Sequence, residues 1–240
     1  MSINPVEIPT GAVRYNTDSN KMEVYIGDTW MEVAVSSPNL DGGARGIAAG
    51  GNPGTNQINF FTISTQGDAQ DFGDLTQSAT LCSTGGSHVR ALTLIGTTSH
   101  KNSIEFITIS STGNALDFGD LIEAQNGPGS ASCSNSTRGL TFGGRNISNT
   151  TLSRIEKIEI ASKGNSTKFG DLTETVRFAS GTSSKTRGVR IAGYEVPANA
   201  DQSTMDYVQI ATEGDAVLFG SLGRSTRSMG TSTSNDHGGL

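Results

Sequence analysis

The chain has 240 residues, of which 31 are glycine, while hydrophobic residues make up 33% and aromatic residues 6%. Glycine and hydroxylated residues are poor helix formers but common in strands and turns, so this composition excludes most helical folds and favours short strands. The formal net charge of −6 is too small to keep a chain unfolded by self-repulsion, and it disfavours a nucleic-acid partner.

No apolar run approaches the roughly 20 residues that a membrane span needs, so we expect no membrane insertion. With two cysteines, Cys82 and Cys133, a disulfide scaffold is excluded. We therefore expect the chain to fold in a reducing cytosol. The two cysteines occupy similar places in successive repeats, where the later repeats carry Gly181 and Gly230, so we interpret them as small buried residues.

Residues 1–44 are predicted to form an N-terminal β-meander followed by a linker. Apolar residues at Val13 and Tyr15, at Met22 to Tyr25 and at Trp30 to Val33 indicate three short strands separated by polar turns. The single tryptophan is expected to be packed. Residues 36–43 read as a linker or long turn.

Residues 45–240 are governed by an internal repeat. A Phe-Gly tract recurs at intervals of 46, 51 and 50 residues, and a period near 50 points to a propeller or another array. The repeats span about 45–89, 90–137, 138–186 and 187–236, and residues 237–240 begin a fifth. The tracts are Phe72-Gly73, Phe118-Gly119, Phe169-Gly170 and Phe219-Gly220.

Each repeat is predicted to contain four strands, the content of one propeller blade. It opens with an arginine and a compact apolar strand, which we place at the centre of a ring. A variable loop follows, then a strand whose first apolar residue is out of phase, as in a β-bulge. A glycine turn, the Phe-Gly strand and a Ser/Thr-rich strand complete the unit. Each Phe is expected to fill the space between neighbouring blades. The loops expected to face a partner are 52–56, 144–151 and 195–204.

The fold expected is all-β, a kelch-like β-propeller of four or five blades. Four blades close a ring by themselves in one arrangement. In the other, the N-terminal meander supplies three strands of a fifth blade whose innermost strand begins at the C-terminus, which removes exposed strand edges. An open array that is closed by sister subunits is a third possibility.

Two resemblances narrow the class of protein. The doubled glycines Gly50-Gly51 and Gly143-Gly144 resemble those of the kelch repeat. The unit from Ile104 to Leu121, followed by Cys133 to Leu140, is similar to repeats in virion structural proteins of tailed phages, particularly those infecting marine cyanobacteria. The segment from Gly11 to Tyr25 also looks like one that recurs in phage fibre proteins. These resemblances imply a particle component, on the tail, fibres or capsid exterior, that is often oligomeric.

Catalytic and metal-binding patterns are sparse. His88, His100 and His237 show no metal-ligand spacing, and no phosphate-binding loop or nucleophile elbow is present. Acidic residues near Asp68 read as solvated turn residues rather than calcium ligands. We therefore expect no enzyme activity, no metal and no cofactor.

One set of charged residues shares a repeat position and is expected to surround one mouth of the ring. In a functional interpretation it binds an anionic sugar or another carboxylate. In the structural interpretation, each arginine pairs with the aspartate of the preceding tract, at Asp74, Asp120 or Asp171. The second is favoured because the fourth tract, which has Ser221, is followed by Gly238 instead of arginine. The set is Arg45, Arg90, Arg138 and Arg187.

The sequence thus predicts a non-enzymatic phage virion structural protein that acts as a rigid display scaffold. It would be made in the host cytoplasm and located in the virion, with other virion proteins and further copies of itself as partners. The alternative is a host-receptor or glycan-binding adhesin at a fibre tip, with a host surface glycan as partner. The loops offer Tyr194 as their aromatic residue, which favours the structural role.

Overall fold

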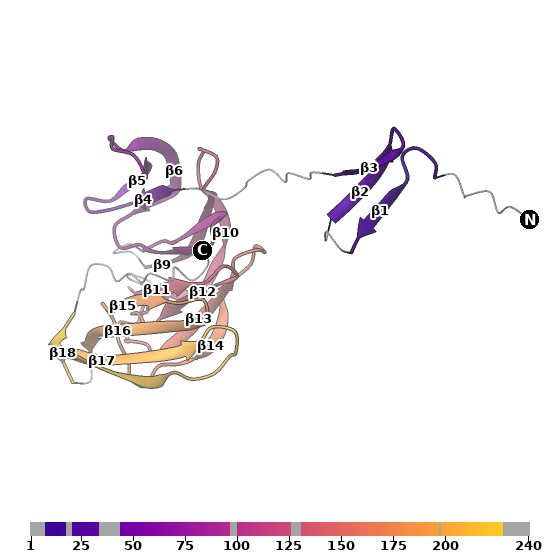
Figure 1. The fold of residues 1–240 in the computed structure, drawn as a ribbon. Coiled ribbons are helices and arrows are strands. Elements are labelled where there is room, and N and C mark those ends of the chain that lie inside the picture. The colour runs from indigo at the N-terminus through magenta and orange to yellow at the C-terminus, as the bar shows by residue number, and fades with distance from the viewer. Residues whose placement is uncertain are drawn as a thin grey trace, which may run out of the picture. The chain divides into compact units, whose positions relative to one another are not determined.

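A computed structural model describes most of the chain (Figure 1). The described residues form five antiparallel sheets and contain no helix, which confirms the all-β prediction. The chain divides into two compact units, Met1–Asn39 and Leu40–Leu240. The predicted linker at 36–43 and the predicted start of a fifth repeat at 237–240 lie outside the described residues, as does Gly230. The described ranges are 8–17, 21–33, 44–96, 100–125, 131–196 and 198–227.

The N-terminal unit is the three-stranded meander predicted from the sequence. Its strands pair in the order β1-β2-β3. The Trp30 ring lies 5.3 Å from the ring of Tyr25 and 4.1 Å from the guanidinium carbon of Arg14. The tryptophan therefore packs within this small unit, as expected. The strands are β1 (Val13–Asn16), β2 (Lys21–Ile26) and β3 (Thr29–Glu32).

The larger unit consists of four sheets that follow one another along the chain. The first has three strands and each of the others has four. The first sheet contains β4 (Arg45–Ala49), β5 (Thr55–Thr62) and β6 (Gln70–Ala79). The second contains β7 (Ser83–Gly86), β8 (Arg90–Leu94), β9 (Lys101–Thr108) and β10 (Leu116–Gln125). The third contains β11 (Ala131–Ser134), β12 (Arg138–Phe142), β13 (Arg154–Glu159) and β14 (Thr167–Asp171). The fourth contains β15 (Ser180–Ser183), β16 (Arg187–Glu195), β17 (Ala200–Gln209) and β18 (Val217–Thr226).

The sheets do not coincide with the predicted repeat units. The Ser/Thr-rich strand that ends each repeat pairs with the arginine strand of the next repeat, so that Gly86 of β7 pairs with Ala91 of β8. A tight turn joins these two strands and brings them together locally. The Ser/Thr-rich strand is therefore the edge strand of the following sheet, and the arginine strand is second. The first sheet lacks an equivalent strand among the described residues.

The edge strands β7, β11 and β15 lie beside one another. Their hydroxyl groups bind the neighbouring edge strand. Ser134 donates to the carbonyl oxygen of Gly86 at 2.8 Å, and Ser183 donates to that of Ser134 at 2.7 Å. Cys133 belongs to β11 and is buried, whereas Cys82 precedes β7 and pairs with no strand residue. The two cysteines therefore do not occupy equivalent positions, contrary to the prediction.

Two details of the third and fourth strands agree with the sequence pattern. In β5 and β13, which occupy the same repeat position as β9 and β17, the pairing register shifts at the first apolar residue, where a bulge was predicted. The shifts lie between Ile58 and Asn59 and between Ile155 and Glu156. The turn that follows has its glycine at positive φ, which is +153° at Gly113. Residues 195–204, predicted as a loop, are different: beyond a bulge after Ile191, the β16–β17 hairpin continues to the pair formed by residues 195 and 200.

The core is divided into three clusters that lie between consecutive sheets. Phe72, Phe118 and Phe169 each belong to one cluster and are 2%, 2% and 4% exposed, as expected for residues between sheets. Phe219 occupies the same repeat position in the fourth sheet but is 52% exposed. The last sheet therefore has a Phe-Gly face that no described residue covers in the way that the other three are covered.

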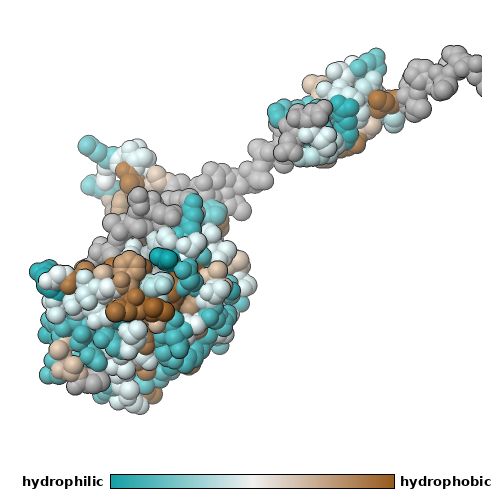
Figure 2. All heavy atoms as spheres, turned by 60° about the horizontal axis from the view of Figure 1, so that its bottom comes forward, coloured by the Kyte–Doolittle hydropathy of each residue, from teal (hydrophilic) through white to brown (hydrophobic). Residues whose placement is uncertain are grey.

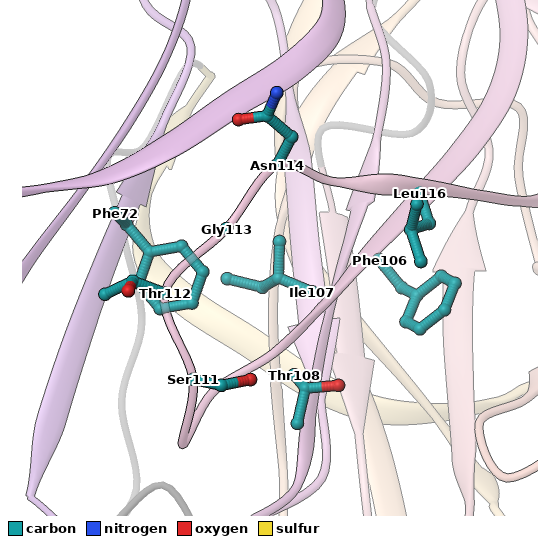
Figure 3. Close-up of a pocket in the computed structure, with 9 residues that line it drawn as sticks. All are labelled: Phe72, Phe106, Ile107, Thr108, Ser111, Thr112, Gly113, Asn114 and Leu116. Carbon is teal, nitrogen blue, oxygen red and sulfur yellow. The ribbon is translucent and has the colours of Figure 1, made fainter.

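Consecutive sheets are also joined through their backbones. The glycine turn of one sheet lies against the Phe-Gly strand of the preceding sheet. In the junction of the second and third sheets, the amide of Gly164 donates to the carbonyl oxygen of Phe118 at 2.9 Å. The approach is so close that a Cβ on Gly119 would lie 2.4 Å from the carbonyl oxygen of Gly164. Figure 3 shows the preceding junction, where the turn through Thr112 and Gly113 passes beside Phe72.

Candidate functional site

Three of the four arginines that were predicted as a set connect neighbouring sheets. The guanidinium of Arg90 donates to the carbonyl oxygens of Ile160 and Ala161, both at 2.8 Å. Arg138 donates in the same way to Ile210 at 3.0 Å and to the residue after it at 2.9 Å. Arg45 donates to Ile109 at 2.6 Å. Each acceptor lies just beyond the third strand of the following sheet.

These contacts differ from the predicted ion pairs with Asp74, Asp120 and Asp171. In the described residues, Arg45, Arg90 and Arg138 bond to backbone carbonyl oxygens instead, and Arg138 also pairs with Glu159 of its own sheet at 2.8 Å. The guanidinium carbons of Arg45 and Arg90 also lie over aromatic rings of their own sheets, 4.8 Å from the ring of Phe60 and 5.2 Å from that of Phe106. The fourth arginine, Arg187, has the ring contact but, within the described ranges, no hydrogen bond to a following sheet.

A second set of polar contacts between sheets was not anticipated. The third strands carry a buried carboxylate that accepts a hydrogen bond from the preceding sheet. Glu105 accepts from the amide of Thr76 at 2.9 Å, and Glu156 accepts from the amide of Ile122 at 3.1 Å. Asp206 is the equivalent in the fourth sheet. The sequence contains a pattern that could have predicted these carboxylates. An acidic residue follows the first apolar residue of this strand in three repeats, while the first repeat has asparagine there.

Two further arginines are neutralised by carboxylates. Arg190 is fully buried and contacts both Asp206 and Glu174, the latter at 3.0 Å. Arg154 contacts Glu123 at 2.6 Å and Glu156 at 2.7 Å. A buried guanidinium without such partners would be strongly destabilising, so these two groups are read as structural ion pairs.

A different cluster brings cationic residues together around one aromatic ring, and we call it the Tyr194 cluster: Arg145, Arg177, Tyr194 and Arg227. Arg177 and Tyr194 exchange backbone hydrogen bonds of 3.1 and 2.8 Å, which fixes their side chains on adjacent segments. The Tyr194 ring lies 4.5 Å from the guanidinium carbon of Arg227 and 5.2 Å from that of Arg177. Cation–π attraction over a tyrosine face accounts for both contacts.

The charge of the Tyr194 cluster is only partly compensated. Arg227 pairs with Asp201 at 3.2 Å, with both side chains about half exposed. Among the described residues, neither Arg145 nor Arg177 has a carboxylate partner. Burial, followed by the charge of Arg145 and that of Arg227, lowers the pKa of Arg177. The Nε atom of Arg177 is buried and has no hydrogen-bond partner in the described part of the chain.

Shallow hollows occur on the larger unit. One of about 190 Å³ lies at the glycine turn of the second sheet and is drawn in Figure 3, with the side chains of Ile107 and Thr112 beside it. Another, of about 260 Å³, lies between β4 and β7 and is lined by Ile47 and Ala49 on one side and by Thr84 to Gly86 on the other. This second hollow borders the edge of β4 on which the first sheet has no partner strand.

Groups for chemistry are not assembled in the described ranges. No group of three histidine, cysteine, aspartate or glutamate residues there is placed to hold a metal ion. None of the described elements is a helix long and apolar enough to cross a membrane.

The chain was compared with known proteins. No protein-family model matches it, and none of the curated proteins is similar to it in sequence.

Proposed function

We propose that the larger unit closes into a four-sheet, kelch-like ring and serves as a rigid, non-enzymatic scaffold in a virus particle. In this arrangement the fourth sheet is followed by the first, and the N-terminal meander remains outside the ring. The observation that carries the proposal is that the two ends of the array have complementary unmatched surfaces. Apolar areas on the larger unit are visible in Figure 2.

The Phe-Gly strand of the fourth sheet has the backbone conformation seen where two sheets meet, but no described glycine turn lies against it. Gly220 keeps a φ of +154°, close to the +152° of Gly119. A Cβ on Gly220 would nevertheless approach only a methyl carbon of Met205, at 3.8 Å, whereas Gly119 has the carbonyl of the following turn at 2.4 Å. Phe219 beside it is half exposed. This surface therefore fits a glycine turn that follows it.

The end formed by the first sheet has such a turn. Gly67 has a φ of +154°, like the turn glycines of the other sheets. Ile63, whose repeat equivalents accept hydrogen bonds from Arg45, Arg90 and Arg138, is 68% exposed. In the closed ring, by analogy with the other junctions, Arg187 would donate a hydrogen bond to the carbonyl oxygen of Ile63. The backbone carbonyl oxygen of Phe219 would accept one from the amide of Gly67. Closure thus supplies partners for both ends at once.

The first sheet also has a free edge. Among the described residues β4 pairs only with β5, whereas the equivalent strands of the other three sheets are paired on both sides. The hollow between β4 and β7 borders this free edge. A ring protects such an edge by placing it at its centre, beside the edge strands of the neighbouring sheets.

A role in a virus particle is supported by the resemblance of the repeat and of the N-terminal segment to tailed-phage virion proteins. The repeated hydrogen bonds between sheets hold the loops in fixed positions, which suits a display scaffold. The N-terminal unit, which is compact by itself, is available for attachment to other virion proteins. The location within the particle that we propose is the tail, the fibres or the capsid exterior.

Labelling of intact particles tests this role. Gold-conjugated antibodies raised against the chain are applied to purified particles of the virus that encodes it, with disrupted particles as a control for hidden epitopes. We expect regular labelling of one external structure. Particles that contain no copy of the chain by mass spectrometry would contradict the proposal.

A second function, binding of a surface glycan, is favoured by one observation. The Tyr194 cluster places two guanidinium groups over an aromatic ring, with the charge of Arg145 close enough to act on Arg177. It includes the aromatic residue that the sequence placed at the edge of a partner-facing loop. Arginine and aromatic side chains are common at recognition sites because they combine charge, hydrogen bonds and a flat surface.

A further inference from the structure

We propose that the Tyr194 cluster binds one oxyanion group, a carboxylate or a sulfate, of an acidic polysaccharide, through the guanidinium groups of Arg177 and Arg227. This inference rests on glycan binding, the second function proposed above, and not on closure of the ring. It names the residues that recognise the ligand and the chemical class that they accept.

The position of the cluster is the first argument. Its residues come from four segments: the turn after β12, the segment before β15, the end of β16, and the residue after β18. Arg145 lies in the turn at 144–151, and Tyr194 lies at the start of the hairpin tip at 195–204. These are two of the three segments that the sequence assigned to partner contact. The fold therefore brings both segments to one place.

The charge balance is the second argument. Elsewhere in this unit, Arg154 and Arg190 contact two carboxylates each, and Arg45 and Arg90 donate to backbone carbonyl oxygens of a neighbouring sheet. The Tyr194 cluster has three guanidinium groups and a single carboxylate, that of Asp201. Burial, and then the like charges of Arg145 and Arg227, lower the pKa of Arg177. A bound oxyanion would offset these like charges and accept hydrogen bonds from the guanidinium groups of Arg177 and Arg227.

The third argument concerns the kind of polyanion. A duplex nucleic acid carries one charge per roughly 1.7 Å and needs many cations along a groove. The Tyr194 cluster offers a local excess of only two charges, three arginines against Asp201, on a chain with a net charge of −6. It suits a single charged group, such as those spaced along an acidic polysaccharide. Several copies displayed on one particle would strengthen such binding through multivalency.

Calorimetric titration of the full chain tests the inference. The probes are a sulfated heparin oligosaccharide, a carboxylated alginate oligosaccharide, neutral dextran and inorganic sulfate. We expect saturable binding of at least one acidic oligosaccharide that weakens as salt is raised, and no binding of dextran. Arg177→Gln and Arg227→Gln should each weaken binding by about 10-fold or more, because each removes hydrogen bonds to a charged group.

Arg224→Gln is the matched control, because it removes the same charge from an exposed position of β18, three residues from Arg227. Binding unchanged in this variant, with loss in Arg177→Gln and Arg227→Gln, supports the site. An equal loss of binding in all three variants would show that net charge alone governs binding, and it would overturn the proposed site. No binding of either acidic oligosaccharide would overturn it as well, and so would inorganic sulfate binding as tightly as the oligosaccharides.

Two further measurements separate the possible failures. Because Arg227 is exposed, Arg227→Gln should keep the thermal midpoint of the wild type and carry the test even if Arg177→Gln fails to fold. Arg177→Lys keeps the charge but loses the planar fork, so it should bind less tightly than the wild type. Ring closure is tested by crosslinking, described below, and its failure would leave oligosaccharide binding by this cluster unaffected.

Discussion

The guanidinium of Arg90, in the second sheet, donates a hydrogen bond of 2.8 Å to the backbone carbonyl oxygen of Ile160, in the third. The acceptor, Ile160, lies just after the end of β13. Equivalent contacts join the first sheet to the second and the third to the fourth. The arginine strand therefore acts across the sheet boundary.

Removal of this contact should weaken the larger unit. Arg90→Met keeps much of the apolar stem but leaves the carbonyl oxygens of Ile160 and Ala161 without their donor. We expect the free energy of unfolding to fall by about 1 to 3 kcal/mol. Urea unfolding followed by far-UV circular dichroism measures it, because the single tryptophan, Trp30, reports on the N-terminal unit. Arg224→Met, at an exposed position, should change stability by no more than about 0.5 kcal/mol. Equal stability of the Arg90 variant and the wild type would count against the contact.

The phenylalanine between the second and third sheets should be a major source of stability. Phe118 is 2% exposed and belongs to a cluster that includes residues of both sheets. Phe118→Ala should destabilise the protein by roughly 3 to 5 kcal/mol, the usual cost of removing a buried aromatic ring. Thermal unfolding measures the effect, and an unchanged midpoint would show that this ring does not hold the sheets together.

Phe219 gives a matched comparison for the closed ring. Its ring is 52% exposed among the described residues, so in an open array Phe219→Ala should cost less than about 1 kcal/mol. If the first sheet covers this face, the loss should approach that of Phe118→Ala. A small loss, measured in the same unfolding experiment, would speak for an open array.

The two cysteines should differ in reactivity. Burial raises the pKa of the Cys133 thiol to about 12, and it also raises that of Cys82. Since the thiolate is the reactive form, Cys133 should resist alkylation at pH 8 in the folded protein and react fully after unfolding. A raised pKa of this acid stabilises the fold below about pH 8.5, the value for an unfolded cysteine, and that stability is lost as the pH rises toward 12. Mass spectrometry after iodoacetamide treatment measures labelling at each cysteine. Rapid labelling of folded Cys133 at pH 8 would contradict its burial.

The repeat made part of the structure predictable. The buried phenylalanines, the bulge beside Ile58 and the turn glycines each occur several times at one spacing, so chance is a poor explanation of any one of them. The sheet to which a Ser/Thr-rich strand belongs was not predictable in this way. Such a strand lies between two possible partners along the chain, and its composition is equally compatible with either.

The candidate site was less accessible to sequence reasoning. The acceptors of Arg90 and Arg138 are backbone carbonyl oxygens, which leave no trace in the residue pattern, so the sequence pointed to aspartates instead. The Tyr194 cluster combines residues from turns and strand ends that do not repeat. The sequence pointed only to Tyr194, because it is an aromatic residue near a variable loop. The arginines around it could not be predicted, because the fold brings their segments together.

Crosslinking tests the closed ring most directly. Between the second and third sheets, the amide of Ser166 donates to the carbonyl oxygen of Asp120 at 2.8 Å. The residues at these repeat positions in the first and fourth sheets are Ala69 and Ser221, and residues joined in this way lie within the range of a disulfide. The variant carries Ala69→Cys and Ser221→Cys, with Cys82 and Cys133 replaced by serine and alanine, and a control carries Ala69→Cys with Ser225→Cys. We expect oxidation to form a disulfide within the monomer in the first variant and none in the control. A first variant that stays reduced, or that links only two separate chains, would contradict the closed ring.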